Sequence, residues 1–195
     1  MKSPLTPLVD FSATIPTLKK MIPRATEVGS YLFFDGHLEF NLSQDNRFIH
    51  AHTNKFLIHD FWKCVSDDPH KINPIALSAF RTVEMSRVHV HYKKSDSLVQ
   101  ILQEQPNMFC SIVAGGHFSY NFFEEGKNKG VVETTTNHKQ LKTHMQRSEN
   151  RWIVLYKFHP NLKEIYKHFN IHMLDHLGRP ITDEQSCEDL VIANF

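Results

Sequence analysis

Alternation of polar and apolar side chains at residues 87–91 is the pattern that most constrains the fold. Val88 and Val90 alternate with His89 and His91, and this period of two predicts a half-buried strand. Successive side chains of a strand point to opposite faces, so the two histidines share one face. Two such imidazoles can bind one metal ion, and imidazole is a common zinc ligand. The same pattern also fits ordinary polar residues on the solvent side of a strand, so both interpretations stay open.

Length and composition indicate one globular domain. The chain has 195 residues, of which 41% are hydrophobic and 22% charged, close to the averages for soluble domains. The formal net charge is only +1, which gives no overall attraction for phosphates or anionic lipid. We therefore expect neither a nucleic-acid nor a membrane partner on grounds of charge.

The cysteines indicate a reducing compartment. Cys64, Cys110 and Cys187 are widely spaced, odd in number and in no CxxC arrangement, so free thiols are expected rather than a disulfide framework. The first residues lead into no apolar signal core, and no apolar run has the length of a membrane span. The expected location is intracellular, in the cytoplasm.

The first fifty residues predict a helix followed by a hairpin. Apolar residues spaced by three and four at residues 11–22 predict a helix that Pro23 closes. An aromatic run at residues 31–34 precedes Asp35-Gly36, which is typical of a hairpin turn, and residues 37–42 alternate like a second strand. A further strand is predicted at residues 47–53.

The rest of the chain predicts helices at residues 74–85, 95–105 and 162–169. Strands are expected at 108–113, 117–123, 152–156, 171–174 and 190–192. Together these elements predict an α/β (α+β) fold with a mixed, mainly antiparallel sheet flanked by helices. The expected organisation is a core at 1–125, a polar loop at 126–150, and a strand-helix-strand extension of the same domain at 151–195.

Three short motifs resemble the JAB/MPN metalloprotease family over residues 10–125. The quoted motifs are Thr26-Glu27-Val28-Gly29-Ser30 before the first strand, His89-Val90-His91, and Ser95-Asp96 leading into a helix. Two features differ from the family pattern, since Tyr92 stands where the family has proline and Ser95 directly precedes Asp96. The resemblance implies a JAB/MPN-like fold in which either the metal site is intact or the fold persists as a scaffold.

The resemblance also implies a ligand set and a reaction. His89, His91 and Asp96 would hold Zn²⁺, Glu27 would act as the general base, and Ser95 would stabilise the oxyanion. Zinc bound in this way lowers the pKa of its water toward neutrality. The expected function is a zinc-dependent hydrolase that cleaves a peptide or isopeptide bond. Its expected partner is a protein or peptide substrate, with a ubiquitin-like conjugate as one form.

Two alternatives remain open on the sequence. One is a catalytically inactive MPN-like scaffold that binds another protein. The other is a metal-free two-histidine phosphoesterase, because His50-Ala51-His52-Thr53 and His117-Phe118-Ser119 supply short H-x-Thr/Ser patterns of the kind that such enzymes place face to face. This alternative requires His50 or His52 to meet His117 in one cleft.

Overall fold

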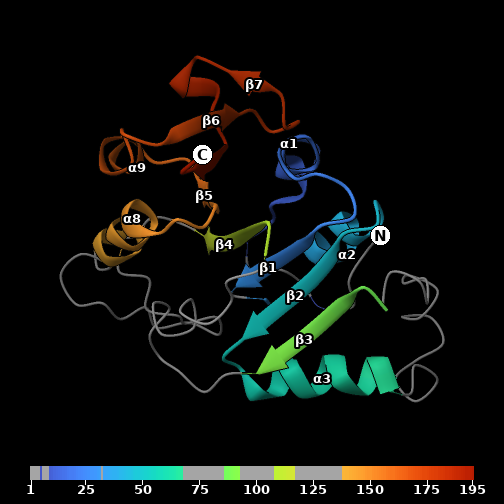
Figure 1. Ribbon diagram of the computed structural model, residues 1–195. Coiled ribbons are helices and arrows are strands. Elements are labelled where there is room, and N and C mark those ends of the chain that lie inside the picture. The colour runs from blue at the N-terminus through green and yellow to red at the C-terminus, as the bar shows by residue number, and fades with distance from the viewer. Residues whose placement is uncertain (1–4, 6–8, 32, 68–85, 93–107, 117–137) are drawn as a thin grey trace.

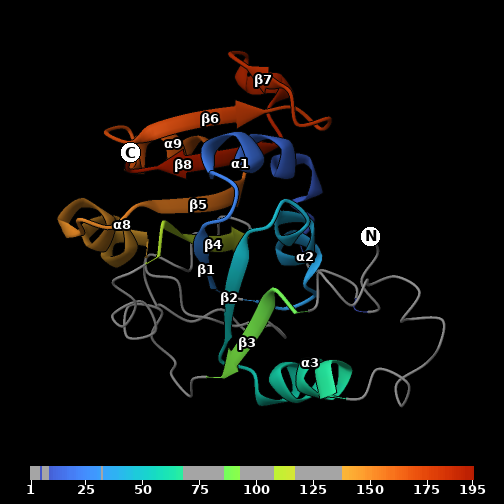
Figure 2. The same ribbon diagram turned by 45° about the vertical axis from the view of Figure 1, so that its right-hand side comes forward.

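The computed structural model describes residue 5 and residues 9–31, 33–67, 86–92, 108–116 and 138–195. These residues form one sheet of eight strands with helices on both faces (Figures 1 and 2). The strands are β1 (Glu27–Tyr31), β2 (Phe48–Thr53), β3 (Val88–Tyr92), β4 (Cys110–Gly116), β5 (Trp152–Lys157), β6 (Asn170–Leu174), β7 (Pro180–Ile181) and β8 (Asp189–Ala193). The helices are η1 (Ser12–Thr14), α1 (Ile15–Met21), α2 (His37–Ser43), α3 (Phe56–Asp67), α8 (His138–Arg147), α9 (Pro160–Ile165) and η3 (Glu184–Ser186).

The sheet has the strand order β3-β2-β1-β4-β5-β8-β6-β7. The first five strands in this order pair in parallel, whereas the pairs β5·β8, β6·β8 and β6·β7 are antiparallel. The mixed α/β class with flanking helices is confirmed, but the mainly antiparallel sheet is wrong. Parallel neighbours require crossover connections instead of hairpins, which is why a hairpin interpretation of the first strands could not hold.

Both faces of the sheet carry a hydrophobic core, as parallel strands require. In β5, Ile153 and Leu155 face the core covered by α1 and α2, and Val154 and Tyr156 face the core beneath α8 and α9. Figures 1 and 2 show these two helix pairs on opposite sides of the sheet. The continuous apolar run from Trp152 follows from burial on both faces.

The predicted hairpin is wrong, because its second strand is the helix α2. Asp35-Gly36 connects a strand to a helix, and the Asn41 side-chain amide donates to the carbonyl oxygen of His37 at 2.7 Å across one helical turn. The alternation at 37–42 misleads because α2 buries residues on several sides, including Glu39. The strand that pairs with β1 is β2, reached only after α2.

Other elements agree with the sequence in part. The helix expected at 11–22 is confirmed by η1 and α1, and the histidine strand by β3. The helix α3 was not expected, and α8 lies within the segment expected as the polar loop 126–150. The expected helices at 74–85 and 95–105 and the strand at 117–123 lie outside the described residues.

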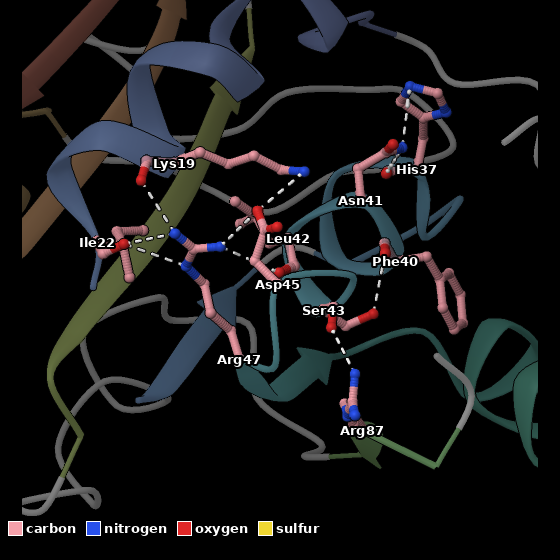
Figure 3. A network of polar contacts seen from close by, with 10 residues as sticks. All are labelled: Lys19, Ile22, His37, Phe40, Asn41, Leu42, Ser43, Asp45, Arg47 and Arg87. Atoms are coloured by element: carbon pink, nitrogen blue, oxygen red, sulfur yellow. Dashed lines mark hydrogen bonds and ion pairs between the residues drawn. The ribbon is translucent and has the colours of Figure 1, made fainter. Parts of the chain in front are cut away.

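Buried Arg47 joins the C-terminal ends of α1 and α2 (Figure 3). Its guanidinium donates to the carbonyl oxygens of Ile22 at 2.6 and 3.1 Å, Lys19 at 3.0 Å and Leu42 at 3.5 Å. Asp45 adds an ion pair at 3.0 Å. The side chain therefore adds hydrogen bonds to carbonyl oxygens at the ends of both helices, although that of Leu42 also accepts from the backbone N–H of Asp45 at 3.4 Å.

Among the described helices, none combines the length and the apolar character needed to cross a membrane.

Candidate functional site

Four imidazoles on two neighbouring strands form a cluster that we call the histidine row: His50 and His52 on β2, and His89 and His91 on β3. The register pairs His50 with His89 and His52 with His91. Ring centroids of these pairs are 5.9 and 4.9 Å apart, and Nδ1 of His50 lies 3.3 Å from Nε2 of His91. His89 and His91 therefore share one face of β3, as the alternation predicts.

The histidine row does not form a metal site. Within the part of the chain that the structure describes, no group of three or more His, Cys, Asp or Glu side chains could hold a metal ion. The imidazoles stack on one another, and Oε2 of Glu27 lies 3.6 Å from Nε2 of His50. The predicted zinc cofactor is wrong, and the role of Glu27 as a base for zinc-bound water loses its basis. Ser95 and Asp96 lie outside the described residues.

The carboxyl edge of the parallel strands contains the candidate site. From β1 the chain adds β2 and β3 on one side of the sheet, whereas β4 and β5 are added on the other side. The strand order therefore reverses between β1 and β4. Ligands of open α/β sheets bind in the crevice outside the carboxyl ends of strands at such a switch point. The residues that matter are those in the turn from β1 to α2 and at the end of β4.

The turn from β1 to α2 is held by aromatic side chains. Trp62 of α3 donates its indole N–H to the carbonyl oxygen of Phe34 at 2.9 Å, and its ring lies 5.6 Å from that of Phe33. Gly36 caps α2 with φ +76°, and a Cβ there would lie 2.6 Å from Cε2 of Phe40. Packing and backbone conformation therefore both require glycine at position 36.

Beside this turn lie two acidic side chains, of which Glu39 is buried and Asp35 is half-buried. Oδ2 of Asp35 is buried and has no hydrogen-bond partner among the described residues. Burial raises the pKa of Asp35, against the effect of the backbone N–H of His37. Glu39 is 5% exposed and accepts a hydrogen bond from the Ser30 hydroxyl at 2.5 Å. Burial raises the pKa of Glu39 to about 7. A cationic ligand group would supply the countercharge that these carboxyls lack.

A third buried carboxyl lies further along the same edge. Because β8 runs antiparallel to β5, Asp189 at its start pairs with Lys157 at the end of β5. Their side chains form an ion pair at 2.6 Å. Burial raises the pKa of Asp189, while Lys157 lowers it, and the charge of Asp10 raises the pKa of both Asp189 and Asp35. Lys157 therefore compensates the charge of Asp189, whereas no lysine or arginine forms an ion pair with Asp35 or Glu39 among the described residues.

Sequence reasoning missed the acidic residues of this site. Asp35 was interpreted as a turn residue and Glu39 as one position of an alternating strand. One pattern in the sequence could have indicated this site. A strand followed by a glycine and an amphipathic segment is typical of a strand-to-helix turn as well as of a hairpin. Nothing local indicates that the two carboxyls are buried.

Comparison with known proteins identifies the fold. No family model matches the chain, and no curated protein matches it by sequence. A TehB-like SAM-dependent methyltransferase from Corynebacterium glutamicum has a similar structure, with TM-score 0.55 and 12% identity over 94% of this chain and 87% of that one. The glycopeptide N-methyltransferase MtfA complexed with S-adenosyl-L-homocysteine gives TM-score 0.58 and 7% identity, over 95% and 90% of the two chains. A SAM-dependent methyltransferase from Aquifex aeolicus gives 0.52 and 9%, over 96% and 95%.

These similarities define the class of fold, which is that of SAM-dependent methyltransferases. At such low identity they establish a shared architecture, and activity has to be argued from the site.

The fold overturns the function that the motifs suggested. The resemblance to the JAB/MPN family is wrong, since structures similar over nearly the whole chain are methyltransferases. The zinc-dependent hydrolase and the ubiquitin-like partner are corrected with it. Neither the inactive MPN scaffold nor the phosphoesterase is retained, and His117, which the latter needs, lies outside the described residues. Motifs as short as H-x-H arise easily in a chain with 14 histidines.

Proposed function

We propose that this chain is a SAM-dependent methyltransferase acting on a small molecule, with the cofactor bound at the carboxyl edge between β1 and β4. The fold supports the proposal, because the similar structures are methyltransferases over nearly their full lengths. The observation that carries it is Asp35, whose buried Oδ2 has no hydrogen-bond partner among the described residues. A buried carboxylate oxygen without a donor is costly unless a ligand pairs with it.

The donor set fits the charged part of SAM. SAM carries a sulfonium and an ammonium group, and Asp35 and Glu39 place carboxyls beside the switch point. When bound, SAM supplies an electrophilic methyl group for transfer to a nucleophile. Asp35 would bind one of the cationic groups and orient it, and Glu39 would add negative charge or a neutral hydrogen-bond donor according to its protonation. Trp62 fixes the turn through Phe34 and so holds Asp35 in place.

A second candidate is a methyltransferase-fold protein that binds no nucleoside cofactor. Glycines in the first strand-to-helix turn let the backbone approach a dinucleotide, but this chain has Phe33 and Phe34 there, and Gly36 alone remains. At the end of β2, where such folds place a carboxylate for the ribose, the chain has Thr53. These substitutions favour a scaffold whose cofactor crevice is filled by its own side chains.

Direct binding separates the two candidates. Calorimetric titration of the full chain with SAM and with S-adenosyl-homocysteine should give saturable binding of one molecule. Asp35→Asn should weaken this binding by about ten- to a hundredfold, because it removes a charge-assisted hydrogen bond. If Asp35 faces the sulfonium, SAM loses more affinity than S-adenosyl-homocysteine, whose sulfur is neutral; if it faces the ammonium, both lose equally.

Asp183→Asn is the control for Asp35→Asn. Asp183 is exposed and caps η3 by accepting from the N–H of Gln185, so this variant should bind like the wild type. Absence of binding of either ligand to the wild-type chain would reject the methyltransferase proposal and favour the cofactor-free scaffold.

A further inference from the structure

Three buried polar side chains from three elements meet beneath α8 and α9. The hydroxyl of Tyr156 on β5 lies 2.7 Å from Nδ1 of His138 at the start of α8 and 3.4 Å from the hydroxyl of Tyr166 after α9. All three residues are at most 1% exposed. Hydrogen bonds in such a dry environment fix side-chain positions more firmly than they do in water. Tyr156 is therefore held at its polar end.

The ring of Tyr156 occupies the space beside an irregularity in β4. The register pairs Ala114 with Leu155 and Gly116 with Tyr156, so Gly115 is an extra residue and forms a bulge. A Cβ at Gly115 would lie closest to Cε1 of Tyr156, 2.7 Å from its Cζ and 2.8 Å from its Cδ1. Only glycine fits, and a glycine bulge bends the strand and often marks a close approach of a ligand or backbone.

The bulge lies at the switch point. On its other side β4 pairs with β1, and the last pair joins Val113 to Tyr31. Gly115 follows two residues later, at the carboxyl end of β4. The backbone at Gly115 packs against the ring of Tyr156. This ring therefore determines the direction in which Gly115 and Gly116 leave the sheet.

We propose that Tyr156, held by His138, is a positioning residue that sets the side-chain-free backbone of Gly115–Gly116 against the ligand bound between β1 and β4. The inference rests on the proposed function for the identity of this ligand, a nucleoside of the SAM type. Tyr156 touches the strand and not the ligand. The His138–Tyr156 hydrogen bond aligns the ring, and the ring aligns the strand end.

The hydrogen bond is built from neutral groups. Burial lowers the pKa of His138 to about 4 and raises the pKa of Tyr156. His138 and Tyr156 therefore both stay neutral around pH 7. The alignment is therefore constant across the ordinary range of pH.

Three variants test the proposal in the full chain. Tyr156→Phe removes only the hydroxyl, His138→Leu removes the imidazole, and His138→Asn keeps a polar atom where Nδ1 lies. Two quantities are measured: the affinity for S-adenosyl-homocysteine and the amide resonances of Gly115 and Gly116 in ¹⁵N spectra. Tyr156→Phe and His138→Leu should shift both glycine resonances and weaken binding about three- to tenfold, the worth of one hydrogen bond. His138→Asn should restore both.

Tyr166→Phe is the matched control, because it removes a neighbouring hydroxyl that lies 3.4 Å from the Tyr156 hydroxyl. The three atoms nearest to a Cβ at Gly115 belong to Tyr156 and not to Tyr166. Tyr166→Phe should lower the melting temperature about as much as Tyr156→Phe does. It should leave the affinity for S-adenosyl-homocysteine and the resonances of Gly115 and Gly116 unchanged. Equal losses of affinity in Tyr156→Phe and Tyr166→Phe would overturn the positioning role, as would unchanged glycine resonances in Tyr156→Phe. If the wild-type chain binds no ligand, the proposed function fails, and the glycine resonances alone decide whether Tyr156 positions β4.

Discussion

Glu39 is a carboxyl group enclosed by the core, next to a single hydroxyl. Its pKa is raised from 4.5 to about 7 because burial disfavours the charged form. A native pKa above the unfolded one means that the native state binds the extra proton between these values. The stabilisation is complete below about pH 4.5 and is lost as pH rises through about 7.

Replacing Glu39 by the neutral isostere should remove this dependence. Glu39→Gln is expected to raise the free energy of unfolding at pH 8 by about 2–3 kcal/mol relative to wild type, and to change little at pH 4. Urea unfolding followed by circular dichroism between pH 4 and 8 measures the effect. Exposed Glu164 provides the control: its pKa is lowered by the hydrogen bond with Lys167, so Glu164→Gln should leave the loss of stability between pH 5 and 8 unchanged. The same loss in Glu39→Gln would show that another group titrates.

Residues 37–42 were predicted as a strand but form the helix α2, and individual residues outside the segment explain the difference. Alternating apolar positions within so short a segment satisfy a strand and a half-buried helix equally well. The features that decide for the helix are Gly36 with its positive φ and the packing of Phe40 against Trp62. Trp62 belongs to a helix that comes later in the chain, so the deciding contact is not local.

At the scale of the elements, the start of α2 depends on Gly36. Gly36→Ala should destabilise the chain by about 2–4 kcal/mol, because alanine disfavours φ +76° and its Cβ would meet Phe40 and Trp62. Chemical unfolding gives the value. Ala25→Gly is the comparison, because Ala25 also has positive φ, at 56°; this change should stay within about 1 kcal/mol of wild type. A cost for Gly36→Ala below that range would mean that α2 can shift.

The ends of α1 and α2 depend on one guanidinium. Arg47→Met should cost about 3–5 kcal/mol, because it removes the guanidinium donor from the carbonyl oxygens of Lys19 and Ile22 (Figure 3). Asp45→Asn, which removes two ion pairs of a partly exposed carboxylate, those with Lys19 and Arg47, should cost less than about 1 kcal/mol. Thermal unfolding of both variants measures the two losses of stability, and that of Arg47→Met should be several times larger. Similar costs would assign the stability to the ion pairs instead of to the helix ends.

Over the whole molecule, the sequence predicts elements better than it predicts their neighbours. The strands with strong apolar runs or alternation, β3 and β5, were placed correctly. Their order was not, because a parallel pair such as β1 and β4 joins residues about eighty positions apart, and no local pattern encodes that pairing. The candidate site was missed for the same reason. It consists of a turn and a strand end that only the assembled sheet brings together, whereas the four histidines of the histidine row stack on one another on β2 and β3.

The position of β8 determines when the sheet can be completed during synthesis. All five of its residues are buried, and it lies between β5 and β6, which have no pairing with each other. Because β6 and β7 precede β8 in the chain, they can pair with each other before β8 is made, but the other edge of β6 stays unpaired until residues 189–193 are available. The parallel strands pair without β8, but β6 and β7 join the sheet only when β8 is inserted beside β5. A chain that ends before Asp189 would therefore leave two unpaired strand edges, those of β5 and β6, which can pair with other chains.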